Sequence, residues 1–121
     1  MSNVSLPEYT LLSKCELPAE VEEIMIDDEK FVTAFKTYRD SVTFTNKRIV
    51  FRDSQGLSGK KVEVYSIPYS TINAWSSENA KGIFDVNAEV ELWTRAGHLK
   101  LKLGKGIDIR EIDRLLANVI L

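Results

Sequence analysis

Apolar and polar residues alternate with a period of two through most of the chain, over residues 30–103. Because successive side chains of a strand point to opposite faces of a sheet, this period predicts β-strands with one buried and one solvated face. Such strands are typical of antiparallel sheets. The clearest example is the segment in which Leu99, Leu101 and Leu103 alternate with lysines. We count about seven strands, enough for two packed sheets or a partly open barrel.

The N-terminal residues 1–28 follow a helical pattern instead. The stretch from Ser5 to Glu8 resembles a capping box, and one helix face would carry Val21, Ile24 and Met25. We therefore expect short helical segments before the first strand.

Residues 108–120 are predicted to form one helix. Asp108 is placed to act as its N-cap, with a glutamate three residues later. The helix would carry an apolar stripe that includes Ile109, Ile112 and Leu116. A helix that follows a run of antiparallel strands must bury such a stripe, most easily over an open end of the sheet. The chain is thus predicted to be one mainly β domain over residues 1–121, closed by a C-terminal α-helix.

The composition narrows the class of protein. Of the 121 residues 44% are hydrophobic, and the formal net charge is only -2, which indicates a globular chain with a real core. This charge balance does not favour a nucleic-acid partner. No apolar run approaches the roughly 20 residues that span a bilayer. The stretch from Met1 to Leu12 lacks the pattern of a signal peptide, so we expect a cytoplasmic location.

Groups able to do chemistry are sparse. His98 and Cys15 are the single histidine and the single cysteine, and neither has the neighbours that a catalytic triad requires. We interpret His98 as an exposed turn residue and Cys15 as a structural or incidental thiol. One histidine and one cysteine cannot assemble the usual tetrahedral zinc set. We expect no enzymatic activity, no metal and no cofactor.

Basic residues gather around one predicted hairpin. Asn46 tolerates positive φ, which favours a tight turn at this point. If the nearby cations converge in space, they form a patch for an anion or an anionic lipid, made of Lys36, Lys47, Arg48, Lys60 and Lys61. The alternative, which we favour, is that hairpin tips and edge strands carry charge to stay soluble and avoid pairing.

Trp93 is the best local indication of a protein partner. It shares a strand face with Glu89 and Glu91, opposite Val90 and Leu92. A solvated sheet face explains the two glutamates more simply than a pair of acid–base carboxylates does. A tryptophan on the outer face of a sheet is a recognised interface anchor.

The stretch Arg39–Phe51, which reads RDSVTFTNKRIVF, resembles the bacterial pleckstrin-homology-like (PH-like) domains. More specifically, it is similar to a small single-domain family of uncharacterised bacterial proteins. The likeness continues through Ser66–Ile72 and Glu89–Trp93 and covers roughly Leu17–Leu121. It implies two nearly orthogonal sheets of seven strands, with the C-terminal helix plugging one end.

The resemblance also implies a function. Members of this family form closed cyclic rings, and single-domain members are expected to be pentamers with a polar protein-docking surface where neighbouring protomers meet. For that surface we select Arg39, Asp40, Asn46, Lys47, Arg48 and Glu78. Phosphoinositide binding does not carry over, because the turn Thr37–Asp40 has one arginine and one aspartate. The preferred hypothesis is a non-catalytic, ring-forming scaffold for another protein; the alternative is an anionic-lipid or small-anion module, so membrane contact stays open.

Overall fold

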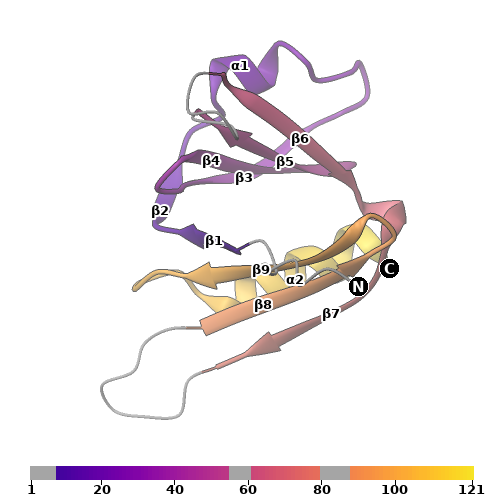
Figure 1. Ribbon diagram of the computed structural model, residues 1–121. Coiled ribbons are helices and arrows are strands. Elements are labelled where there is room, and N and C mark those ends of the chain that lie inside the picture. The colour runs from indigo at the N-terminus through magenta and orange to yellow at the C-terminus, as the bar shows by residue number, and fades with distance from the viewer. Residues whose placement is uncertain (1–7, 55–60, 80–87) are drawn as a thin grey trace, which may run out of the picture.

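Two β-sheets face each other and enclose the core, and one helix closes the structure (Figure 1). The computed structural model describes residues 8–54, 61–79 and 88–121. Sheet A has the strand order β1 (Glu8–Leu11), β9 (Gly97–Leu103), β8 (Ala88–Thr94) and β7 (Ile72–Glu78). Sheet B has the order β2 (Ser13–Cys15), β3 (Phe31–Lys36), β4 (Asp40–Thr45), β5 (Arg48–Asp53) and β6 (Glu63–Pro68). A short 3-10 helix, Tyr69–Thr71, joins the two sheets.

The predicted mainly β fold is confirmed. The seven strands expected between residues 30 and 103 are β3 to β9, and each pairs antiparallel with its sequence neighbour in the same sheet. Strand β8 shows the expected alternation, because Val90 and Leu92 are fully buried while Glu89 and Glu91 are partly exposed.

The C-terminal helix, α2 (Ile109–Ile120), begins as predicted. The Asp108 side chain accepts a hydrogen bond of 3.0 Å from the backbone N–H of Arg110. The stripe residues Ile109, Ile112 and Leu116 are buried in the core. Neither helix within the described ranges is long and apolar enough to span a membrane.

The expected helical N-terminal segment is mostly wrong. Its described part begins with two strands, and the only helix is the single turn α1 (Ala19–Glu22). Residues 8–11 form a strand because Tyr9 and Leu11 both point into the core, where the Tyr9 ring lies 4.5 Å from that of Phe51. The proposed capping box falls partly outside the described residues, and its last member, Glu8, opens β1.

Strand β1 also departs from the all-antiparallel expectation, because it pairs in parallel with β9. Its end lies very close to the turn that follows β9, where the Gly104 N–H donates a 2.7 Å hydrogen bond to the Leu11 carbonyl. A Cβ atom at position 104 would lie 2.8 Å from that same oxygen, so only glycine allows this approach. The chain then crosses to sheet B as β2, which links the two sheets (Figure 1).

The outer face of sheet B is covered by the α1 segment, which lies above it in Figure 1. Ala34 and Val50 point away from the main core yet are fully buried, and Val21 of α1 is buried as well. Of the three residues expected to share a helix face, Val21 alone is buried, because α1 ends before Ile24 and Met25.

Candidate interaction surfaces

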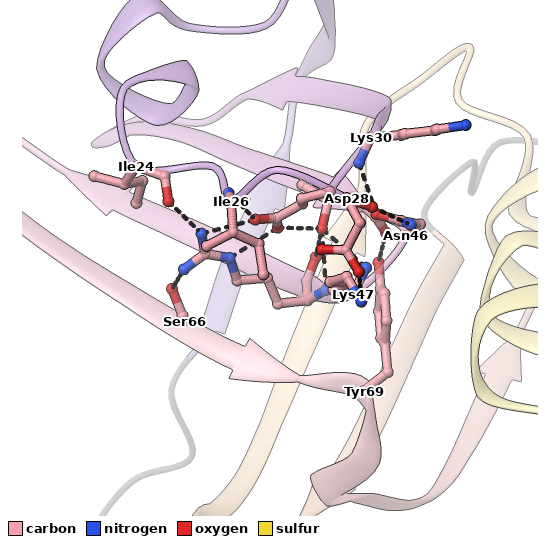
Figure 2. Close-up of polar contacts among 11 residues, drawn as sticks. Ile24, Ile26, Asp28, Lys30, Asn46, Lys47, Ser66 and Tyr69 are labelled. Atoms are coloured by element: carbon pink, nitrogen blue, oxygen red, sulfur yellow. Dashed lines mark hydrogen bonds and ion pairs between the residues drawn. The ribbon is translucent and has the colours of Figure 1, made fainter.

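The β4–β5 hairpin is bound to the segment that precedes β3 by a buried ion pair (Figure 2). The Glu29 side chain is fully buried, and the Arg48 guanidinium donates two hydrogen bonds to its carboxylate, of 2.8 and 2.9 Å. The Thr45 hydroxyl donates a third, of 2.6 Å. These bonds, that from Arg48 above all, outweigh burial and hold the pKa of Glu29 at about 2. Arg48 also donates to the Ile24 carbonyl at 2.8 Å and to the Ser66 hydroxyl at 3.1 Å.

Asn46 and Lys47 extend this contact at the tip of the hairpin. The Asn46 side chain accepts a 2.7 Å hydrogen bond from the Lys30 N–H and donates one of 3.2 Å to the Asp28 carbonyl. The Lys47 ammonium lies 3.0 Å from the Asp28 carboxylate, and its hydrogen bond lowers the pKa of Asp28. We call the contacts of Asn46, Lys47 and Arg48 with residues 28–30 the hairpin clasp.

The hairpin itself is confirmed, but the expected conformation of Asn46 is wrong. No non-glycine residue in the described ranges has positive φ. Asn46 serves the turn through its side-chain amide instead.

The predicted docking residues lie in three places within one chain. Arg39 and Asp40 are at the opposite end of β4 from the hairpin clasp, and a six-residue strand spans roughly 17–20 Å. There Arg39 forms an ion pair of 2.9 Å with Asp53, and Asp40 forms one with Arg52. Glu78 lies in the other sheet, exposed on β7.

The cations of the anion-binding alternative are not gathered either. Lys47 and Arg48 have acidic partners in the hairpin clasp, while Lys36 lies beside the start of β4, at its other end. Lys61 is exposed just before β6, and Lys60 lies outside the described residues.

The outer face of sheet A carries the exposed tryptophan that the alternation predicts. Trp93 is 38% exposed, and its ring stacks on that of His98 with centroids 4.8 Å apart. His98 lies within β9 rather than in a turn, and its Nε2 is 2.6 Å from the Glu91 carboxylate. The one histidine is therefore half-exposed and already paired.

Cys15 lies on β2, half-buried and free. Burial, more than any nearby charge, raises the pKa of its thiol, which leaves little thiolate at neutral pH.

Strand β6 has a surface that the sequence interpretation missed. It forms the edge of sheet B, and Val62, Val64 and Tyr65 are all more than 40% exposed on or beside it. Val64 and Tyr65 point to opposite faces, so both sides of this edge are apolar. Val62 and Val64 are two positions apart in the sequence, but this spacing indicates an exposed apolar edge only once the order of the strands in the sheet is known.

Two facing sheets closed by a C-terminal helix define a PH-like domain. The comparison with known families agrees: the bacterial PH domain model matches residues 2–120, and the chain belongs to that family.

Its relatives are small proteins of similar length. The uncharacterized protein YjqA of Bacillus subtilis (strain 168) is 37% identical over 117 residues, which cover 94% of this chain and 93% of the relative. YozO from the same organism, also uncharacterized, is 34% identical over 97 residues, covering 80% and 83%.

Two solved structures have the same fold. A DUF1696 family protein with a pleckstrin-homology domain from Shewanella loihica PV-4 has a TM-score of 0.78 and 38% identity, over 90% of this chain and 97% of that one. A pleckstrin homology domain from Shewanella amazonensis SB2B has a TM-score of 0.65 and 39% identity, over 85% and 84%.

Proposed function

We propose that this PH domain is a non-catalytic cytoplasmic scaffold that binds another protein. It assembles with copies of itself into a closed ring, which we propose to be a pentamer. The observation that carries the proposal is the apolar edge of β6. Sheet edges in proteins are usually protected by charge, proline or a covering segment, since an open edge pairs with other chains. Here Val64 and Tyr65 are 45% and 42% exposed on the two sides of the edge.

Pairing β6 with an edge strand of a second copy would cover part of both side chains and satisfy backbone groups that have no strand partner in the described chain. A ring requires that the partner strand be a different edge, since β6 against β6 of a second copy would give a two-fold dimer, and such an interface is heterologous. A heterologous interface forms a ring when its rotation closes. The five-fold number comes from the resemblance to ring-forming single-domain members.

A composite docking surface fits this assembly. Arg39 and Asp40, the hairpin clasp and Glu78 lie apart within one chain. A single protein-binding site that uses all of them needs residues from neighbouring protomers. Arg48 contributes to such a site through the hairpin that it holds in place, because its own guanidinium is bound to Glu29.

The non-catalytic role is supported by the state of the two residues most often used in catalysis. His98 is stacked on Trp93 and bonded to Glu91 on a flat sheet face, and the thiol of Cys15 has a raised pKa. Neither arrangement offers an activated nucleophile with a base and an orienting acid.

The test compares two substitutions of exposed aliphatic residues, Val64→Lys on β6 and Ile26→Lys on the loop before β3. Sedimentation equilibrium gives the mass of each variant. We expect Val64→Lys to lower the mass toward that of one chain, because a buried, unpaired lysine opposes strand pairing, and Ile26→Lys to keep the mass of the wild type. Equal masses for Val64→Lys and the wild-type oligomer would exclude β6 from the interface.

A further inference from the structure

A groove of about 420 Å³ lies between strand β3 and helix α2. Its apolar wall is made of Val32 from the strand together with Leu115 and Val119 from the helix. Val32 is 45% exposed, so the apolar surface is open to solvent. None of the residues proposed above for ring formation or partner docking lines it.

The strand side of the groove offers free backbone. Strand β2 pairs with β3 only from Ala34 to Lys36, so the Phe31–Thr33 half of that edge has no strand beside it in the described chain. An open edge next to an apolar wall is the arrangement in which an extended peptide adds as one more strand.

The helix side of the groove carries a cation that has no counter-ion among the described residues. The Lys14 ammonium and the Glu111 carboxylate pair with each other at 2.7 Å across one end. Arg114 is exposed and forms no ion pair with any other described residue. The groove thus has one excess positive charge beside an apolar wall, which complements an apolar side chain next to a carboxylate.

The shape of the groove favours a single strand over the edge of a second copy. The free edge of β3 is three residues long, and β2 continues the same line beyond it. Helix α2 forms the opposite wall. A strand that is already part of a sheet brings a neighbour about 4.8 Å away on its other side, where the helix stands.

We propose that this groove binds a short extended segment of a partner protein by pairing with the Phe31–Thr33 edge of β3. The segment carries an apolar residue that packs against Leu115 and Val119. It also carries, two residues away and therefore on the same face, an acidic residue that binds Arg114. This inference rests on the proposed role in protein binding, and names a site and a partner chemistry for it.

In the experiment, a phage-displayed library of random ten-residue peptides is selected for binding to the full chain. The enriched sequence is then synthesised, and its affinity for the protein is measured by titration calorimetry. We expect enrichment of an acidic and an apolar residue at a spacing of two. Arg114→Glu should weaken the synthetic peptide at least about tenfold. The matched control is Arg110→Glu, one turn earlier on an exposed position outside the groove, which should leave the affinity within about twofold.

Hydrogen exchange on the same complex gives the second measurement, in which the backbone amide of Val32 should gain protection. Equal effects of the two arginine variants, or protection gained on β6 instead, would overturn the proposal. So would a Val32 amide that is protected without peptide and loses that protection in Val64→Lys, because a second copy would then cover the groove. Light scattering on each sample separates the proposals: a ring that selects no such peptide overturns the groove alone, and a monomer that binds it overturns the ring alone.

Discussion

The Glu29 carboxylate stabilises the hairpin only because its charge is matched inside the protein. Moving a carboxylate out of water costs several kcal/mol unless a partner with good geometry compensates it. Arg48 supplies two hydrogen bonds and Thr45 a third, and the side chain of Glu29 has no exposed surface. The pair therefore fixes the loop before β3 onto the hairpin. Removing Arg48 leaves the Glu29 carboxylate buried without its cation, and removing the charge of Glu29 leaves the mostly buried Arg48 guanidinium without an anion.

The depressed pKa of Glu29 predicts a specific loss of stability in acid. The carboxyl has a pKa of about 2 in the folded chain against 4.5 as its ordinary value. Its contribution is thus fully present above about pH 4.5 and is lost as the pH falls toward 2, because the unfolded chain takes up the proton first. We expect Glu29→Gln to lower the free energy of unfolding by about 3 kcal/mol at pH 7 and to reduce its decline below pH 4.5. Urea denaturation across this pH range measures both effects.

Asp27→Asn is the matched control, since Asp27 is an exposed carboxylate on the same loop. It should follow the wild-type curve. A Glu29→Gln variant as stable as the wild type at pH 7, with the same acid slope, would show that the ion pair does not stabilise the fold.

At the level of elements, α2 is held against sheet A by a polar contact as well as by its apolar stripe. The Asp113 carboxylate accepts hydrogen bonds from the Trp75 indole N–H at 3.1 Å and from the Ser77 hydroxyl at 2.5 Å. These bonds lower the pKa of Asp113, that from Ser77 most. The contact joins the middle of the helix to edge strand β7.

We expect Asp113→Ala to destabilise the protein by about 2 kcal/mol, because the partly buried indole N–H loses a charged acceptor. Thermal unfolding gives the stability, and a change in tryptophan emission reports the altered surroundings of Trp75. Asn118→Ala changes an exposed residue five positions later on the same helix and should leave both unchanged. If the aspartate and asparagine variants melt together, the contact adds nothing to helix docking.

The elements that the sequence predicts well are those with one-sided burial. Strands β8 and β9 and helix α2 each bury one face, so their period is visible in the residues themselves. Strands β4 and β5 are buried on both faces, and their apolar and β-branched residues still indicate strands. Strands β1 and β2 have four and three residues, too few to display a period. They are strands because of partners far along the chain, with Glu8 opposite Lys100 and Ser13 opposite Lys36.

Whether a surface residue could be predicted from the sequence likewise depends on whether a local pattern displays its position. Trp93 is exposed because its position in β8 alternates with buried residues, which the sequence displays. The partners of Lys47 and Arg48 could not be found that way, since Asp28 and Glu29 belong to a loop that reads only as the end of a helical pattern. The open edges of β6 and β3 depend on the order of strands in the sheet, which no local pattern contains.

For the whole molecule, the pairing of cations predicts weak membrane affinity. Lys47 and Arg48 bind carboxylates within the chain, and Lys36 lies at the far end of β4. Each exposed lysine or arginine adds only about 1 kcal/mol near an anionic surface. We expect the wild-type protein to stay at the bottom of a flotation gradient with phosphatidylserine vesicles at physiological salt. Salt-sensitive flotation would instead support the alternative of an anionic-lipid module.

The mass of the native particle tests the central claim, assembly of this PH domain into a ring, most directly. Native mass spectrometry of the wild-type chain counts its subunits without labels or partners. We expect one closed species near five times the 13.7 kDa mass of the chain. A single species at 13.7 kDa over the whole concentration range would contradict it, because the β6 edge would then be open in solution and no composite surface between protomers would exist.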